Sequence, residues 1–460
     1  MVAIGEAKIC WGHMADFSGQ NMTLFRYLPK PIKNYLESRG NLSIVAENTT
    51  WLLGEKFIRL LLGVLVGAWV ARYLGPSQFG QLSYVLAFLA FFQAISGLGI
   101  DSILVRDLSK NPEKSSQLVG SAIVMRAVAG LACWIIAVVL MAILEGFDFN
   151  LVAITAIIGC GLLFQATDVF DLWFQSQSLN RLTVTVKLVA YILASTVKVF
   201  CILSGGNLVW FAVVAALEFI LVAGGLYVAY KRSRPRAVLA FSSDVAYAIV
   251  RESWPLILAS LSVIIYMRID MMMIKSILGE KQVGFYAAAL SLSNLWHVIP
   301  MSICSSVAPI IAQKKMVSES EYYIGLSKVF RICLAASIVV CAVVYLCGDY
   351  VIWRMFGDAY ADAALVLKIH IFTNIPVFLG VARSLWTTNE GKQWFSAWCT
   401  VAGALTSILL NQILLLKFGL IGAAYSALGS QMIAAIISTG LLDRRILWIQ
   451  LGFRPNLLKV

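Results

Sequence analysis

The chain has 460 residues, of which 60% are hydrophobic and only 13% are charged, against about 25% charged residues in a typical soluble domain. Its apolar runs recur at roughly the 20-residue length that crosses a bilayer and do not alternate with period two, which excludes a soluble protein and a membrane β-barrel. The formal net charge of +12 is typical of basic cytoplasmic loops, so we expect no nucleic-acid partner. The composition predicts an all-α polytopic membrane protein.

The cysteines and histidines give no sign of a bound metal. The nine cysteines are scattered and lack CxxC spacing, and the three histidines, His13, His297 and His370, are far apart. A metal site or a disulfide framework needs such residues at close, paired spacing. We therefore expect no metal, no cofactor and no disulfide framework.

Residues 1–47 are polar and irregular and predict a cytoplasmic N-terminal tail, within which Met22 is an alternative start. Twelve apolar spans are predicted after this tail, near residues 48–73, 78–98, 117–144, 151–174, 182–203, 208–230, 253–278, 283–311, 326–346, 364–386, 395–416 and 420–440. Residues 441–460 are predicted to form a cytoplasmic C-terminal tail. We expect Pro255, Pro300 and Pro376 to interrupt their helices.

The basic residues of the connecting segments fix the orientation. If the N-terminus is cytoplasmic, the outside segments contain only Arg72, Lys281, Arg354 and Lys417, and the other connecting lysines and arginines lie inside. Cytoplasmic loops carry such an excess of Lys and Arg. The pattern therefore predicts that both termini are cytoplasmic.

The basic segment 231–252 divides the spans into an N-terminal lobe, residues 48–230, and a C-terminal lobe, residues 253–440. The first span pair contains LGPSQFGQLSYVLA from Leu74, and the seventh and eighth spans contain the similar LGEKQVGFYAAALS from Leu278. Six spans in each lobe give both lobes the same orientation, related by a pseudo-two-fold axis along the membrane normal. This plan is typical of an alternating-access transporter.

Several ionisable residues fall inside the predicted spans, where charge is costly and usually functional. The basic ones are Lys56, Arg59, Arg126, Lys187, Lys198 and Arg268, and the acidic ones are Glu55, Asp168, Asp171, Glu218 and Asp270. Asp168, Asp171 and Lys275 lie near span ends, which favours structural pairs or snorkelling.

Lys56 and Arg59 share one side of the first span with Glu55, and the i,i+4 spacing allows an ion pair between Glu55 and Arg59. Arg59 could therefore face a cavity or only hold Glu55, and the sequence leaves both open. On an adjoining side, Gly63 and Gly67 form a GxxxG pattern that predicts close helix packing.

Arg126, Lys187, Lys198 and Arg268 have no acidic partner nearby in sequence, so we expect them to line a cavity. Lys187 and Lys198 share a face, and Arg268 and Asp270 are too close together to point the same way. A cavity lined by cations suits a phosphate or diphosphate. The acids Glu55, Glu218 and Asp270 could take up H⁺ or Na⁺ to drive transport. Asn374 and Asn411 are more simply explained as interhelical hydrogen-bonding groups.

The stretches WLLGEKFIRLLLGVLVGAWVARYLGPSQFGQLSYVLAF from Trp51, GLGIDSILVRDLSKNPEK from Gly97 and YMRIDMMMIKSILGEKQVGFYAAALSLSNLWHVIP from Tyr266 are similar to bacterial polysaccharide transporters of the O-antigen flippase type. These belong to the multidrug/oligosaccharidyl-lipid/polysaccharide exporter superfamily. The resemblance implies transport of an undecaprenyl-diphosphate-linked oligosaccharide from the cytoplasmic to the periplasmic leaflet of the inner membrane, through a cationic cavity. It also implies contact with membrane lipid, with a polysaccharide polymerase and with a chain-length regulator.

Two other functions compete with this interpretation. A drug or organic-cation antiporter of the same superfamily would need acids to dominate its cavity, whereas basic residues are at least as numerous here. A membrane-embedded polymerase would need a substantial catalytic loop outside the membrane, whereas the longest internal candidates, 230–252 and the segment from Asp349 to Ala363, are short and carry no recognisable nucleotide-sugar or metal motif.

Overall fold

The computed structural model describes the backbone of residues 40–235 and 238–453, and their side chains except those of residues 40–53, 55–57, 393 and 442. The predicted tail 1–47 thus lies largely outside the described residues. By its internal contacts the chain separates into residues 1–54 and residues 55–460. Helices α4 to α20 all belong to the second unit.

Every regular element in the described ranges is helical, as the apolar runs predict. The elements up to residue 235 are α3 (Gly40–Ser96), α4 (Asp101–Lys110), α5 (Ser115–Leu144), α6 (Phe149–Gly159), α7 (Gly161–Phe164), α8 (Asp168–Ser176), α9 (Asn180–Leu203) and α10 (Leu208–Ser233). Those after residue 238 are α11 (Ser243–Leu278), α12 (Glu280–Ser293), α13 (Val298–Val317), α14 (Glu319–Phe356), α15 (Ala361–His370), α16 (Asn374–Asn389), α17 (Gln393–Phe418), α18 (Leu420–Met432), α19 (Ser438–Leu442) and α20 (Arg444–Gln450).

Eleven helical stretches of the described chain are long and apolar enough to cross a membrane. The first, Ile58–Lys110, has 53 residues, and at about 1.5 Å per residue it would be more than twice as long as the roughly 30 Å hydrocarbon core. Gly75 interrupts it with φ 74° and ψ 170°, and Pro76 follows. This stretch therefore contains two spans, in agreement with the predicted 48–73 and 78–98 and with twelve spans in all.

Four predicted spans consist of shorter helices in succession. Short 3-10 turns separate α7 from α8, α12 from α13 and α15 from α16, and a π-helical turn, Ile433–Ile437, separates α18 from α19. Pro300 and Pro376 follow two of these turns, as predicted. The expected interruption at Pro255 is wrong, because α11 continues through it from Ser243 to Leu278.

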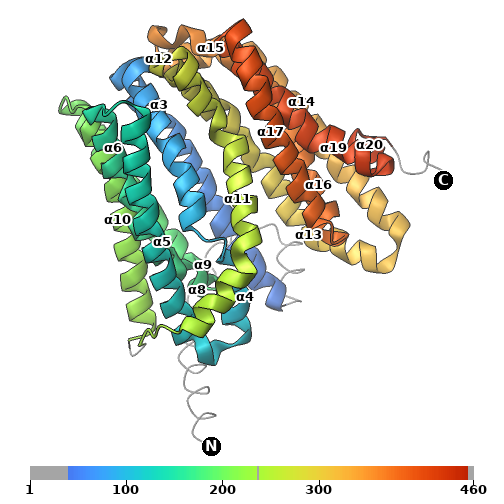
Figure 1. Ribbon diagram of the computed structural model, residues 1–460. Helices are drawn as coiled ribbons and strands as arrows, with labels where there is room; N and C mark the ends of the chain where they lie inside the picture. Colours follow the sequence, from blue (N-terminus) through green and yellow to red (C-terminus); the bar gives the residue numbers. More distant parts are fainter. Residues whose placement is uncertain (1–39, 236–237, 454–460) are drawn as a thin grey trace, which may run out of the picture. The chain divides into compact units, whose positions relative to one another are not determined.

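Helix α11 joins the two halves of the described chain. Figure 1 shows α5, α6 and α10 on one side of α11 and α14, α16 and α17 on the other. One part of α11 packs against α4 and α5 and another against α12 and α17. The non-helical connection is shorter than the predicted linker 231–252, since α10 ends at Ser233 and α11 begins at Ser243. The backbone N–H of Ser242 donates to Ser121 Oγ at 2.9 Å, which fastens this connection to α5.

The predicted repeat produces a symmetrical contact between the two halves. Gly75 and Gly279 share an unusual backbone conformation, with φ 74° and 87°, which only glycine adopts without strain. Gly80 then packs on the Glu280 backbone and Gly284 on the Pro76 backbone, so closely that an added Cβ would lie 1.9 Å and 2.0 Å from the respective carbonyl oxygens. The 204-residue offset of the repeat relates both partners, which fits a pseudo-two-fold axis.

Candidate functional site

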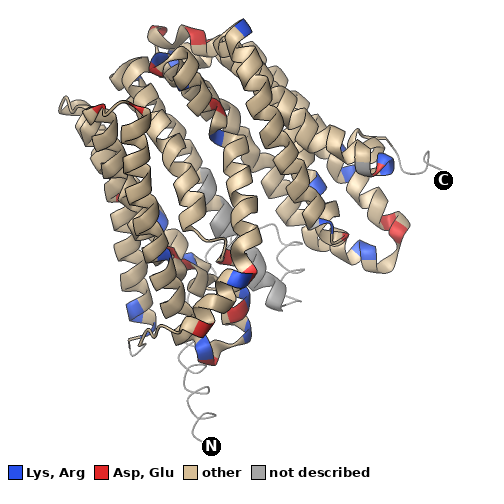
Figure 2. Cartoon of the chain, viewed as in Figure 1, with Lys and Arg blue, Asp and Glu red and all other residues tan. Residues whose placement is uncertain are grey.

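Most charged residues of the described chain lie near helix ends, and fewer lie along the middle of the helices (Figure 2). A charged side chain along the middle of a membrane helix is costly unless it has a partner. We call α3–α10 the first lobe and α11–α20 the second lobe. Lys275 of α11 pairs with Glu145 at the end of α5, and the other internal charges of the two lobes are held in different ways.

In the first lobe, three helices bring Arg59, Lys198 and Glu218 together. Arg59 Nη2 lies 3.2 Å from Glu218 Oε1, and Lys198 Nζ lies 3.6 Å from Glu218 Oε2. The Tyr191 ring stands beside both cations, with its centroid 4.9 Å from Arg59 Cζ and 5.9 Å from Lys198 Nζ. We call these four residues the Glu218 cluster. The side chains of Glu55 and Lys56 lie outside the described residues.

Two further ion pairs join different helices of the first lobe. Arg126, only 3% exposed, pairs with Asp101 and donates to the Gly97 carbonyl at 3.0 Å. Lys187 Nζ lies 2.6 Å from Asp171 Oδ2. Arg126, Lys187 and Lys198 therefore all have carboxylate partners, and these partners come from other helices and not from nearby in sequence. The structural-pair interpretation of Asp171 is confirmed.

In the second lobe, Asp270 is 5% exposed and has no ion-pair partner in the described chain. It accepts hydrogen bonds from Tyr286 Oη at 2.7 Å, Asn411 Nδ2 at 2.6 Å and Ser407 Oγ at 3.0 Å. Asp270 thus points at α12 and α17. Arg268, two residues earlier on α11, is half-buried and forms no ion pair with any described residue.

A neutral polar network adjoins Asp270. The Tyr286 ring meets the His370 ring edge to face at 5.9 Å, and His370 Nδ1 lies 2.9 Å from Ser293 Oγ. Asn374 Nδ2 donates to the Ser293 carbonyl at 3.2 Å. Asn374 and Asn411 are thus interhelical hydrogen-bonding groups, as expected. The Asn411 Oδ1 atom is buried without a hydrogen-bond partner among the described residues.

Arg383 is a buried charge that the sequence interpretation missed. It is 6% exposed, and its Nη1 donates to the Ala434 carbonyl at 3.0 Å and to Thr439 Oγ1 at 2.8 Å. Ala434 lies inside the π-helical turn Ile433–Ile437, and Thr439 follows the turn by two residues. A basic residue inside the predicted span 364–386 was the available signal.

The prediction from the GxxxG pattern is wrong at Gly67. A Cβ at Gly67 would meet no atom within 4 Å, whereas a Cβ at Gly63 would lie 2.8 Å from Tyr191 Oη. Gly63 therefore makes room for the Tyr191 side chain of the Glu218 cluster and not for a neighbouring helix backbone. Arg59 and Gly63, on adjoining sides of α3, thus both lie against Tyr191 of the Glu218 cluster.

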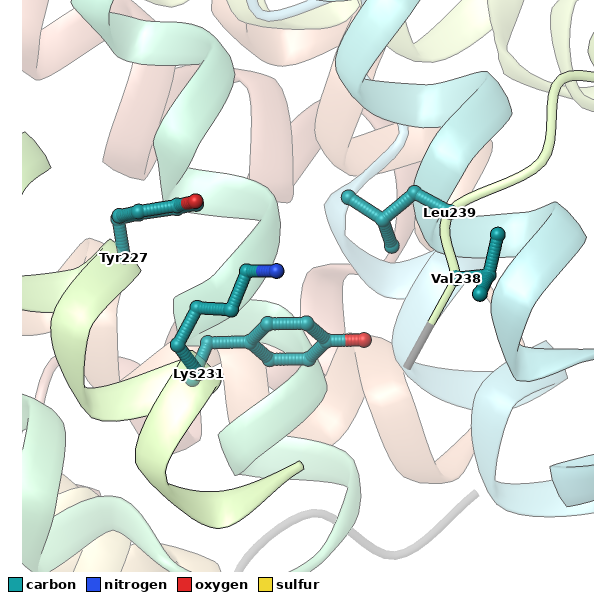
Figure 3. Close-up of a pocket in the computed structure, with 5 residues that line it drawn as sticks. Tyr227, Lys231, Val238 and Leu239 are labelled. Carbon is teal, nitrogen blue, oxygen red and sulfur yellow. The ribbon is translucent and has the colours of Figure 1, made fainter. Parts of the chain in front are cut away.

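Two hollows lie away from these charges. One, of about 360 Å³, is lined by Tyr227, Tyr230, Lys231, Val238 and Leu239. Figure 3 shows Tyr227 and Lys231 pointing from α10 toward Val238 and Leu239. The other, of about 410 Å³, is lined by Leu65, Ala68, Trp69, Arg72, Arg354 and Met355. Neither contains any of the predicted site residues. Among the described residues, no three His, Cys, Asp or Glu side chains come together as a metal site.

Comparison with known proteins gives two family matches. The model of the family described as "Polysaccharide biosynthesis protein" matches residues 45–315, more than half of the chain, and the MatE model matches residues 255–413. Among curated proteins, no sequence matches.

Three solved structures illustrate the fold. The lipid II flippase MurJ, in an inward closed conformation, gives a TM-score of 0.70 at 13% identity, over 87% of this chain and 90% of that chain. An inward-facing multidrug resistance MATE family transporter of the MOP superfamily gives 0.66 at 17% identity, over 85% and 95%. A MOP superfamily transporter from Pyrococcus furiosus gives 0.63 at 15% identity, over 89% and 96%. The chain has their two-lobed, twelve-helix fold.

Proposed function

This chain belongs to the polysaccharide biosynthesis protein family and is a multi-pass transporter or flippase of the MOP superfamily, and on that premise we propose that it flips an undecaprenyl-diphosphate-linked oligosaccharide. The cargo is a repeat unit of O-antigen or of another surface polysaccharide. It moves from the cytoplasmic to the periplasmic leaflet of the bacterial inner membrane. Both termini are cytoplasmic, and the polymerase and chain-length regulator of the same polysaccharide are its partners.

The observation that carries this proposal is the family match over residues 45–315, which takes in the first lobe from residue 45 and the second lobe as far as α13. The fold of the lipid II flippase MurJ supports it, because that protein too moves a lipid-linked substrate across a membrane. Residues 349–356 are helical, and a tight turn follows at Gly357. This leaves little room there for the catalytic loop that a polymerase would need. A transporter therefore accounts for the chain better than a polymerase does.

The charged groups have distinct roles in this mechanism. The sugar and diphosphate travel between the lobes while the polyprenyl tail stays in lipid. Arg59, Lys198 and Arg268 bind the diphosphate, because each presents donors to anionic oxygens and none is sealed from solvent as Arg126 is. Arg126 and Lys187 shape the first lobe through their pairs with Asp101 and Asp171.

Asp270 is the residue we propose for coupling to H⁺ or Na⁺. A buried carboxylate that lacks a cationic partner is costly in its charged form and has a reason to bind a proton or a cation. Three neutral donors hold it in place, and the unpartnered Asn411 Oδ1 is a further oxygen nearby. Glu218 has two cations beside it and is the less suitable coupling group.

The test is complementation of a bacterium that lacks its only flippase of this class and accumulates lipid-linked repeat units on the cytoplasmic side. The wild-type chain should restore surface polysaccharide, and Arg59→Ala or Arg268→Ala should lower export about tenfold or more, by loss of a charged hydrogen bond, at unchanged amounts of inserted protein. Lys417→Ala, at an exposed helix end, removes the same charge and should export normally.

Two outcomes would contradict the proposal. Wild-type protein that inserts but restores no polysaccharide would overturn the flippase function. Normal export by both arginine variants would overturn the cationic binding site. An organic-cation antiporter would instead confer resistance to cationic drugs that depends on Asp270 and is indifferent to Arg59.

A further inference from the structure

Glu218 is the shared counter-ion of two cations that come from different helices. Each carboxylate oxygen faces one of them, Arg59 at 3.2 Å and Lys198 at 3.6 Å. Both distances exceed the roughly 2.7–2.9 Å of a tight charge-assisted hydrogen bond. The Lys187–Asp171 pair of the same lobe, at 2.6 Å, is tight by this measure. Glu218 is therefore loosely held in comparison with its neighbour.

The Glu218 cluster is also accessible. The side chains of Arg59, Lys198 and Glu218 are 35%, 23% and 19% exposed, whereas that of Arg126 is 3% exposed. The packing of the lobe therefore does not enclose these two cations as it encloses Arg126. Gly63 leaves the space in which the Tyr191 ring supports them.

Resting on the proposed function, we infer that Glu218 occupies the position of the cargo's phosphates and makes the site select a diphosphate over a monophosphate. A diphosphate can span Arg59 and Lys198, one phosphate on each, and displace the carboxylate from both. A monophosphate replaces the carboxylate at one cation only and stays beside its negative charge, where like charges repel. Glu218 is thus a specificity-determining residue, and it returns to the cations when the cargo leaves.

The experiment measures binding of radiolabelled undecaprenyl diphosphate and undecaprenyl monophosphate to the purified full-length protein in detergent. The wild-type protein should prefer the diphosphate. Glu218→Gln should bind the monophosphate about tenfold more tightly, because a charged competitor is removed. The ratio of the affinities for diphosphate and monophosphate should therefore fall toward one. Asp171→Asn removes the same charge from the tight pair of the same lobe and is the matched control, in which the preference should persist.

A second variant keeps the inference testable if Glu218→Gln does not fold. Lys198→Gln should weaken binding of the diphosphate more than that of the monophosphate, because it removes one of the two phosphate positions. Equal weakening of both lipids would overturn the inference.

The possible failures can be told apart. Diphosphate binding by the wild type with an unchanged preference in Glu218→Gln would overturn the role of Glu218 alone. Equal shifts in Glu218→Gln and Asp171→Asn would show an effect of net charge only and would also overturn it. Failure of every variant and of the wild type to bind either lipid would overturn the proposed function, and this inference with it.

Discussion

The two lobes bury charge by different means. In the first lobe, Arg59, Arg126, Lys187 and Lys198 each have a carboxylate partner from another segment. In the second lobe, Asp270 is held by neutral donors and Arg383 by carbonyl and hydroxyl oxygens. Asp270, Arg383 and Arg268 form no ion pair with any described residue.

This difference suggests a division of labour. An ion pair can exchange one anion for another, so the first lobe is suited to binding and releasing an anionic cargo. A charge fixed by neutral dipoles keeps its geometry but stays uncompensated, so Asp270 is suited to binding a coupling ion and Arg383 to rigid support. Three experiments would break or sharpen this comparison.

Arg383→Met should have the largest effect. The change removes the bonds to the Ala434 carbonyl and Thr439 Oγ1 around the π-helical turn, and bonds to a charged group contribute about 1.5–3 kcal/mol. We expect the free energy of unfolding to fall by about 2–3 kcal/mol, measured by thermal denaturation of the protein in detergent. Arg331→Met is the control, because among the described residues Arg331 donates a hydrogen bond only to a carbonyl of its own helix. Equal losses in both variants would contradict the role of Arg383.

Asp270→Asn tests the second lobe as the coupling lobe. A neutral amide keeps the size of the side chain but cannot carry the charge that binds H⁺ or Na⁺. We expect gradient-driven export in vesicles to fall about tenfold, in line with one lost charged hydrogen bond, and to become insensitive to the imposed gradient. Ser407→Ala removes one donor to Asp270 and keeps its charge, so it should retain the gradient dependence. If export by Asp270→Asn still responds to the gradient, the coupling ion binds at another residue.

The smallest effect is expected at the Lys187–Asp171 pair. With side chains 26% and 11% exposed, it should contribute about 0.2–1 kcal/mol, as partly exposed pairs do. A double-mutant cycle with Lys187→Met, Asp171→Asn and both together would give this coupling from thermal denaturation. A coupling larger than the loss in Arg383→Met would reverse the comparison between the lobes.

The repeat turn shows how far sequence similarity reached. LGPSQFG and LGEKQVG predicted equivalent turns, and Gly75 and Gly279 do share one backbone conformation. That Gly80 and Gly284 then pack across on each other's turns could not be read from either stretch. Local conformation depends on local residue type, whereas a contact between lobes depends on the path of all the helices between them.

The candidate site shows the same limit more sharply. The sequence identified Arg59, Lys198, Glu218 and Asp270 as candidate site residues, because a charged residue inside an apolar run is visible in the sequence alone. It suggested Glu55 for Arg59 because i,i+4 is the pairing rule within one helix, and that prediction stays open because the Glu55 side chain lies outside the described residues. It could not find Glu218, which is 159 residues from Arg59.

The sequence by itself determined the class of the protein, its twelve spans and the identity of most of its intramembrane charges, because each follows from the cost of placing polar groups in lipid. Only the tertiary structure decided which of those charges are paired and which, Arg383 included, are held by neutral dipoles. The reason is physical: a buried charge takes its partner from whichever helix packs beside it, and that neighbour is set by the fold and not by distance along the chain.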